Sequence, residues 1–250
     1  MGKKKKKKAA AGVLLLLFVA VMLLGYIGYR IMRPTRYAAF GISVPAGFTI
    51  HGIDVSRFQE RIDWEEVKNM RSQGKRIGFT FIKATEGRTR VDEHFRRNWS
   101  HAREAGLHRG AYHFFLADRS PSEQAGHFIR TVQLSAGDLP PVLDVEETMG
   151  ESDESIRRGV KEWLRLIEAH YGVRPIIYAN IDFYESHLGS EFDEYPFWVA
   201  HYWQHNRPRT TRKWLFWQHS EAGQVNGISH PVDFNVFNGD SLDFADVLIR

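Results

Sequence analysis

The chain has 250 residues, of which 43% are hydrophobic, so it can bury one sizeable core and is not intrinsically disordered. Residues 1–36 hold nine of the 34 Lys and Arg residues and none of the 30 Asp and Glu residues. The remainder therefore carries 25 basic and 30 acidic side chains, a net charge of about −5, which argues against nucleic acid as a partner. The sequence contains no cysteine, so an exported domain would not rely on disulfides.

The N-terminal segment predicts a membrane anchor. Lysines occupy positions 3–8, and residues 9–29 that follow carry no charge and are long enough to cross a bilayer as a helix. This run is longer than the core of a typical signal peptide, which favours an uncleaved anchor over a cleaved signal. The lysine excess predicts a single-pass protein of the cytoplasmic membrane, with its N-terminus inside and its domain on the periplasmic or cell-wall side.

The expected division of the chain follows from this segment. Residues 1–8 form a basic cytoplasmic tail, residues 9–29 contact membrane lipid, residues 30–47 form a juxtamembrane linker, and residues 48–250 form one globular domain.

Within that domain, short apolar and β-branched runs alternate with helical patterns and then follow one another closely. Strands are expected at residues 51–56, 77–84, 109–115, 141–146, 174–181, 197–203, 214–220 and 232–237. The first five runs are separated by helix-length segments, and the last three leave little room for helices. This order predicts an α/β fold, an irregular TIM-like (β/α)5(β)3 barrel preceded by a single transmembrane helix. An open doubly wound sheet is the alternative.

The run PPVLDVEET at residues 140–148 ends with two acids two positions apart. Residues two apart on a strand face the same side, and barrel enzymes carry their chemistry at the carboxyl ends of the strands. We therefore expect Asp144 and Glu146 to face the barrel mouth together with Asp54 and Asp233. Clustered carboxylates raise one another's pKa, so one of them can act as an acid, as glycoside hydrolysis requires. A structural ion-pair or capping site is the other interpretation.

Seven motifs of this domain, taken in order, resemble glycoside hydrolase family 25, the lysozymes that cleave N-acetylmuramoyl linkages in peptidoglycan. The motifs are GIDVSRFQERIDW (52–64), FIKATEG (81–87), GAYHFF (110–115), PVLDVE (141–146), IIYAN (176–180), FWVAHY (197–202) and VDFNVF (232–237). The resemblance covers residues 51–237. It implies a catalytic barrel at residues 48–250 that hydrolyses the β-1,4 bond between N-acetylmuramic acid and N-acetylglucosamine, with peptidoglycan glycan strands as its partner.

The resemblance also implies roles for the four acids. Glu146 matches the family's proton donor, and Asp144 matches the partner that stabilises charge or orients the 2-acetamido group of the sugar. Asp54 and Asp233 match the acidic residues of the first and last strand motifs. Whether the reaction is retaining, inverting or substrate-assisted stays open at this stage, because carboxyl separation depends on rotamers.

Tyr112 and Tyr178 match tyrosines that line the family's substrate cleft. Trp198 lies in a family motif and is a third candidate for substrate contact, with packing inside the barrel as the other interpretation. No cofactor and no metal are expected, because His201 and His205, although four residues apart, lie in a strand-like pattern and the sequence has no HExxH motif. Two departures from the family pattern occur: Gln59-Glu60 stands where Gln-Gly is usual, and His219 stands where an aromatic Tyr is common.

Two other functions are compatible with the same residues. The first is a catalytically inactive peptidoglycan-binding module, against which the four retained acids argue, because buried acids without a task are costly. The second is a metal-dependent polysaccharide deacetylase that uses the same carboxylates.

Overall fold

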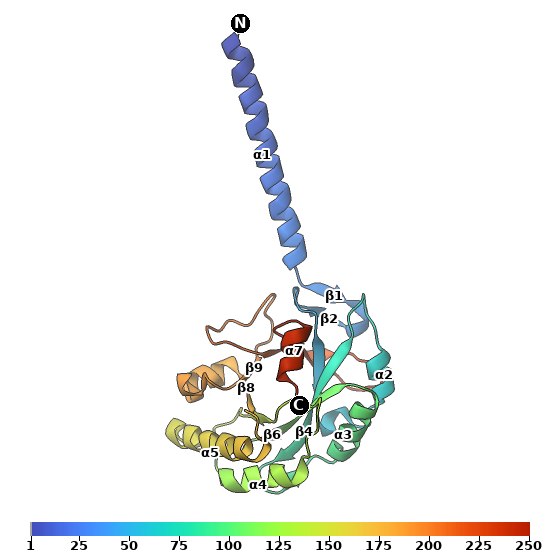
Figure 1. The fold of residues 1–250 in the computed structure, drawn as a ribbon, viewed down its shortest axis with the longest axis vertical. Coiled ribbons are helices and arrows are strands. Elements are labelled where there is room, and N and C mark those ends of the chain that lie inside the picture. The colour runs from blue at the N-terminus through green and yellow to red at the C-terminus, as the bar shows by residue number, and fades with distance from the viewer. Residues whose placement is uncertain (1) are drawn as a thin grey trace.

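The computed structural model describes the backbone of residues 2–250 and the side chains of residues 14–29 and 33–250 (Figure 1). Helix α1 (Gly2–Met32) extends away from the rest of the molecule, and its apolar side chains from Leu14 to Ile27 are exposed. Among the described residues, no helix combines the length and apolar character needed to cross a bilayer. The predicted tail at residues 1–8 and the first part of the predicted span, residues 9–13, lie outside the described side chains.

A nine-stranded sheet forms the body of the domain and closes into a barrel. Its strands are β3 (His51–Val55), β4 (Ile77–Glu86), β5 (Arg90–Val91), β6 (His108–Phe114), β7 (Val142–Asp144), β8 (Ile176–Asn180), β9 (Phe197–Ala200), β10 (Phe216–Gly223) and β11 (Val232–Phe237). Neighbours from β3 to β10 pair in parallel, apart from the short hairpin strand β5. Strand β11 pairs antiparallel with both β10 and β3. This closure confirms the predicted barrel and excludes the open sheet.

Helices cover the outside of the barrel only along the first part of the chain. They are α2 (Trp64–Asn69), α3 (Phe95–Glu104), α4 (Pro121–Thr131), α5 (Asp153–Tyr171) and the short α6 (Ile181–Phe183), followed by a π-helical turn (Tyr184–Leu188) and a 3-10 turn (Ser190–Phe192). The longest of them, α5, begins where the Ser152 side chain caps Ser155 N–H and ends at Gly172 in the left-handed conformation. No helix connects β9, β10 and β11, as the sequence predicts.

The segment before β3 covers the side of the barrel where helices are lacking. Strands β1 (Thr35–Tyr37) and β2 (Ile42–Val44) form a hairpin around a 3-10 turn (Ala38–Phe40). The Phe40 ring packs 5.1 Å from the Phe234 ring, and the Phe40 carbonyl accepts a 2.9 Å hydrogen bond from Gln224 N–H. Part of the segment for which the sequence predicts a linker is therefore folded onto the barrel.

Aromatic side chains fill the barrel at the amino ends of the parallel strands. Phe79, Phe81 and Phe216 are fully buried there, and helix α7 (Ser241–Val247) covers them with Phe244, whose ring lies 5.7 Å from Phe79. Glycine is required at position 52, because a Cβ atom there would lie 2.4 Å from the Phe79 ring. The closed end leaves the opposite end, where the parallel strands terminate, for a site.

Candidate active site

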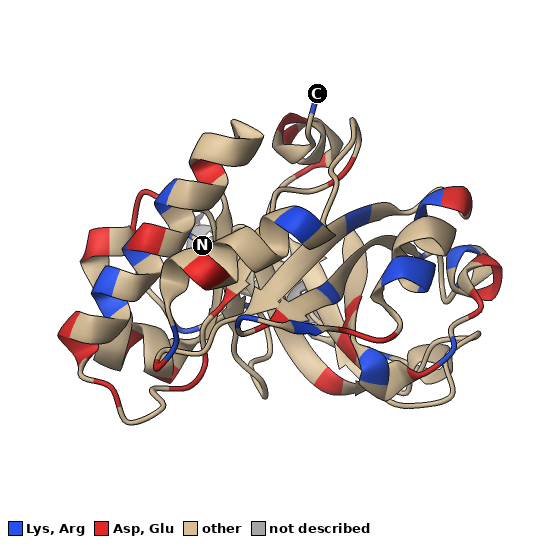
Figure 2. Ribbon diagram, turned by 90° about the horizontal axis from the view of Figure 1, so that it is seen from below, with Lys and Arg blue, Asp and Glu red and all other residues tan. Residues whose placement is uncertain are grey.

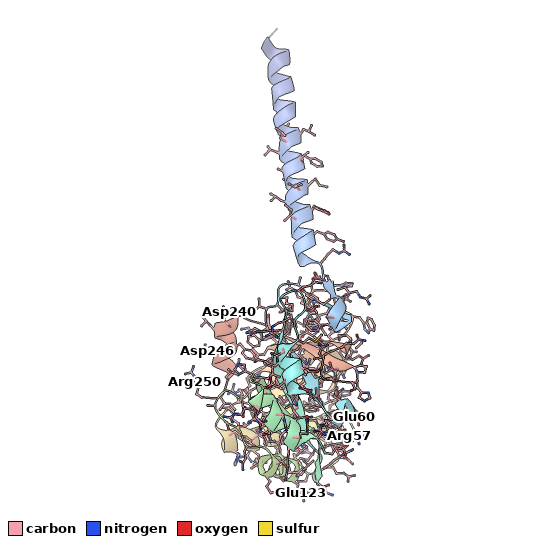
Figure 3. The ribbon with its side chains drawn as sticks, turned by 90° about the vertical axis from the view of Figure 1, so that its right-hand side faces the viewer. Arg57, Glu60, Glu123, Asp240, Asp246 and Arg250 are labelled. Atoms are coloured by element: carbon pink, nitrogen blue, oxygen red, sulfur yellow. The ribbon has the colours of Figure 1, made fainter. Side chains whose placement is uncertain are left out.

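The structure brings the four predicted acids to one end of the barrel. Asp54 lies near the end of β3, Asp144 is the last residue of β7, and Glu146 follows two positions later. Asp233 is at the start of β11, but this strand runs in the opposite direction, so its register places Asp233 opposite Asp54. In Figure 3 the loop after β3, marked by Arg57 and Glu60, lies on the opposite side of the domain from helix α7.

Asp54 and Asp233 form a pair in which Asp54 is hydrogen-bonded from within the barrel. Asp54 Oδ2 accepts hydrogen bonds from Gln218 Nε2 at 2.9 Å and from Asn235 Nδ2 at 2.7 Å. Burial raises the pKa of Asp54 to about 6, although these hydrogen bonds oppose the shift. Burial, the charge of Asp54 and a hydrogen bond to it raise the pKa of Asp233 to about 9. The proton that the pair shares at neutral pH therefore belongs to Asp233.

The orientation of the Gln218 amide is set by two tyrosines. The Tyr178 and Tyr202 hydroxyls donate to Gln218 Oε1 at 2.9 and 2.6 Å, which leaves the amide nitrogen to donate to Asp54. Gln218 is thereby held as a donor toward an ionised carboxylate, and it keeps Asp54 charged.

Trp198 supports the same network from the barrel interior. Its side chain is 2% exposed, stacks 4.3 Å from Phe81 and lies 4.5 Å from the Tyr178 ring. Its Nε1 donates a 2.7 Å hydrogen bond to Asn235 Oδ1, which leaves the Asn235 amide nitrogen for Asp54. The structure therefore packs Trp198 within the barrel, and the sugar contact expected for it stays a prediction.

Asp144 and Glu146 differ from this pair because one of their oxygens has no partner. Asp144 is 6% exposed, and its buried Oδ1 makes no hydrogen bond with any described residue. Burial, together with the charge of Glu146, raises the pKa of Asp144 well above its usual range. Burial also raises the pKa of Glu146, which is only half-buried and can reach a ligand. The two carboxyls together hold a proton to a higher pH than an exposed pair would.

The predicted tyrosines lie beside the acids. Tyr112, on β6, is half-buried, and its pKa is raised by burial and by the charges of Asp54 and Asp144. Tyr178 lies opposite Asp144 in the register of β7 and β8. The Tyr178 hydroxyl donates to Gln218, and its hydrogen bonding also lowers the pKa of Glu146. Gln218 and Glu146 are therefore alternative acceptors for one hydroxyl proton.

Sequence reasoning missed four further residues of the site, which are Lys83, Tyr202, Gln218 and Asn235. Lys83 forms a 2.8 Å ion pair with Glu86, and its charge lowers the pKa of Asp144. Strand periodicity would have identified Asn235, because it stands two positions after Asp233 on the same face. No cluster of three His, Asp or Glu side chains in the described part of the chain is arranged to hold a metal ion.

Comparison with known proteins identifies the family. The sequence profile described as "Glycosyl hydrolases family 25" matches residues 53–228. The chain belongs to this family. It is therefore a glycoside hydrolase, and the resemblance drawn from its motifs is confirmed.

Relatives cover most of the chain. The Escherichia coli K12 protein named "Uncharacterized protein YegX" is 52% identical over 220 residues, which cover 88% of this chain and 80% of that protein. "Lysozyme M1" of Streptomyces globisporus is 36% identical over 210 residues, covering 76% of this chain and 68% of that protein. A solved family 25 glycosyl hydrolase from Bacillus anthracis superimposes with a TM-score of 0.74 at 33% identity, covering 81% of this chain and 94% of that one.

Proposed function

We propose that this glycoside hydrolase is a lysozyme that hydrolyses the β-1,4 bond between N-acetylmuramic acid and N-acetylglucosamine in peptidoglycan. The observation that carries the proposal is the Asp144–Glu146 pair at the barrel mouth, which retains a proton and has one buried oxygen without a partner. The relative named Lysozyme M1 supports the same substrate. Glu146 acts as the general acid and Asp144 as the residue that orients the 2-acetamido group.

Substrate binding places the proton on the correct carboxyl. In the free enzyme burial raises the pKa of both carboxyls, so the pair holds a proton to a higher pH than an exposed pair would. When the acetamido N–H of the muramic acid ring donates to Asp144 Oδ1, this hydrogen bond favours the ionised form of Asp144. The proton then resides on Glu146, which faces the glycosidic oxygen.

Bond cleavage follows from this arrangement. Glu146 protonates the glycosidic oxygen as the bond from C1 to that oxygen breaks, and the acetamido carbonyl oxygen forms a bond to C1. The resulting cyclic oxazolinium ion is stabilised by the carboxylate of Asp144. A water molecule then attacks C1 as the bond from C1 to the acetamido oxygen breaks, which restores the acetamido group, and the water gives its proton to Glu146, which restores the acid. Two displacements at C1 retain the β configuration.

The test of the activity uses the purified full-length protein on purified peptidoglycan, with products resolved by mass spectrometry. We expect muropeptides that end in reducing N-acetylmuramic acid, lost in Glu146→Gln and retained in Glu147→Gln, because Glu147 is the exposed neighbouring carboxylate. Binding without new reducing ends would instead support the inactive wall-binding module. Loss of acetate from uncut strands would support the deacetylase.

The stereochemical test is independent of the first. Proton NMR during the first minutes of hydrolysis resolves the anomer released at the new reducing end. Substrate assistance predicts release of the β anomer. Release of the α anomer would show that water attacks C1 directly and that the acetamido group does not take part.

We also propose that residues 9–29 anchor the protein in the cytoplasmic membrane, with the N-terminus inside and the barrel on the periplasmic or cell-wall side. The exposed apolar side chains from Leu14 to Ile27, on a helix that leaves the domain, support this, as do the lysines at positions 3–8. Resistance of the protein to carbonate extraction, with a C-terminal reporter active outside the cytoplasm, is the expected result. Release by carbonate would refute the anchor.

A further inference from the structure

Two segments far apart in the sequence surround the base of α1. Residues 33–48, which contain the β1–β2 hairpin, and residues 201–215, the loop from β9 to β10, lie at the end of the domain from which α1 leaves (Figure 1). They share a cavity of about 780 Å³, lined among others by Tyr29 and Arg33 at the end of α1, Ile42 of β2 and Trp203 of the loop. We call these two segments the anchor-proximal face.

The anchor-proximal face carries charge of one sign. Its two segments contain no Asp or Glu, although the chain beyond residue 36 is acidic overall. The exposed cations are Arg33, Arg36, Arg207, Arg209 and Lys213. None of these five side chains forms an ion pair with a described acid. Arg212 differs because it is buried and bound to the carbonyls of Phe192 and Tyr195.

A large aromatic side chain stands among these cations. Trp203 is 89% exposed, whereas Trp163, Trp198 and Trp217 are buried. Its backbone adopts a φ of 61°, a conformation that is unfavourable for a bulky residue. Tryptophan is enriched at the interface between membrane and water, where its ring lies at the level of the lipid headgroups.

The opposite end of the domain has a different surface. Figure 2 views the molecule from that end and shows Lys and Arg interspersed with Asp and Glu along the helices. On α5, for example, Lys161 pairs with Glu191, and Arg174 just beyond the helix pairs with Glu168. The acid-free composition is therefore a property of the anchor-proximal face and not of the whole domain.

We infer that the anchor-proximal face docks on anionic lipid headgroups, with Trp203 inserted at the interface and the exposed arginines and Lys213 paired with phosphates. This docking rests on the proposed membrane attachment, and the partner is a lipid surface because exposed cations that pair with no described acid attract an anionic bilayer. Arg33 and Trp203 line one cavity with Tyr29, near the end of the exposed apolar helix.

Docking would fix the direction in which the catalytic cleft opens. In Figure 3, α1 leaves from the top of the domain, whereas Arg57 and Glu60 of the mouth and Asp240 and Asp246 of α7 lie on opposite sides. The mouth lies lower in this view than α7, so the line from α7 to the mouth runs obliquely and away from α1. A domain docked at the base of α1 presents its mouth to the side and away from the membrane, where a glycan strand can enter.

The test measures hydrogen exchange of backbone amides in the full-length protein held in lipid nanodiscs. The nanodiscs contain either phosphatidylcholine alone or an equal mixture of phosphatidylcholine and phosphatidylglycerol. We expect the anionic lipid to slow exchange within residues 201–213 by about fivefold or more, because one surface cation near an anionic membrane contributes an effect of this size. At high salt, exchange should return to its rate in phosphatidylcholine. The combined variant Arg207→Gln, Arg209→Gln and Lys213→Gln should lose this difference.

A matched control separates the effect of cations on the anchor-proximal face from the effect of the protein's total charge. Arg96→Gln, Arg130→Gln and Arg165→Gln remove the same number of exposed cations from α3, α4 and α5 and should keep the slowed exchange. Equal exchange in the two lipids, or slowing that survives in the loop variant, would overturn the docking. Loss of the protein from phosphatidylcholine nanodiscs would refute the anchor alone, since the lipid-dependent slowing can still be measured with phosphatidylglycerol vesicles.

Discussion

The barrel mouth holds two pairs of acids that are built in opposite ways. In the first pair, two side-chain amides of the barrel donate to Asp54, and burial and the charge of Asp54 raise the pKa of its partner Asp233 to about 9. Asp144 and Glu146 have raised pKa values as well, but Asp144 Oδ1 is buried without a partner. An unsatisfied buried acceptor costs about 1–3 kcal/mol, so it is expected where a ligand supplies the missing donor.

Four acids in one cleft therefore do not share one task. The pair made by β3 and β11 is complete before substrate arrives, and we assign it to holding the site's charge and shape. The pair at the end of β7 is completed only by substrate, and we assign it to the chemistry. The predictions below test this division.

The largest effect is expected for Glu146→Gln. The variant keeps the size of the side chain but has no proton to donate, so kcat on peptidoglycan should fall by about 10³–10⁴. Steady-state release of reducing ends measures the loss. A variant that keeps more than a tenth of the wild-type kcat would remove Glu146 from the role of acid.

Asp144→Asn should lower kcat by about 10²–10³, because the amide lacks the negative charge that stabilises the oxazolinium ion. KM should change much less than kcat, since the lost interaction is strongest in the transition state. The same assay with substrate varied gives both constants. Equal loss in Asp54→Asn and Asp144→Asn, with identical changes in KM, would erase the distinction between the two pairs.

Gln218→Leu tests the enclosed pair. It removes a donor from Asp54 and leaves the Tyr178 and Tyr202 hydroxyls without their acceptor, so the free energy of unfolding should fall by about 1–3 kcal/mol. Because Gln218 hydrogen bonding lowers the pKa of Asp54, that pKa should rise further in the variant. Urea denaturation measures the stability, with exposed Gln224→Leu beyond the end of β10 as the control for a Gln-to-Leu change.

Asp233→Asn should change how stability depends on pH. The folded pKa of Asp233 is about 9 against an ordinary value of 3.8, so between these values the unfolded chain releases a proton that the folded chain keeps. Wild-type stability therefore falls as pH rises through this window, by up to about 1.4 kcal/mol per pH unit. Asn removes this contribution, and Tm measured from pH 5 to 9 should decline less steeply. An unchanged slope would contradict the protonated Asp233.

The smallest effect is expected for Glu147→Gln. The charge of Glu147 raises the pKa of Glu146, so its removal lowers that pKa and the acid is lost at a lower pH. The alkaline limb of the kcat/KM profile should therefore move to lower pH, with little change in the maximum. A shift to higher pH would show that Glu146 does not control this limb.

The barrel and the position of its acids could be predicted from strand periodicity and element order. The alternation in PVLDVE places Asp144 and Glu146 on one face, and the eight strands fall where the sequence predicts them. The sequence predicts a linker where the structure has the hairpin at residues 35–44, because short strands with few apolar residues carry a weak signal.

Residue roles within the site were harder to predict than its location. The aromatic character of Trp198 suggested sugar contact, whereas the structure buries it. Strand periodicity places Asn235 on the face of Asp233, but the role of Gln218 depends on side chains that tertiary packing brings together from β3, β8 and β10. Strand periodicity alone does not predict whether a single aromatic side chain is buried or how a side-chain amide is oriented.

The most direct measurement is a crystal structure of Glu146→Gln with a bound peptidoglycan oligosaccharide that spans the cleavage site. The account predicts that the acetamido nitrogen of the muramic acid ring lies within hydrogen-bond distance of Asp144 Oδ1, while Asp54 keeps its bonds to Gln218 and Asn235. An acetamido group that contacts Asp54 instead, or that turns away from Asp144, would contradict the division between the two pairs.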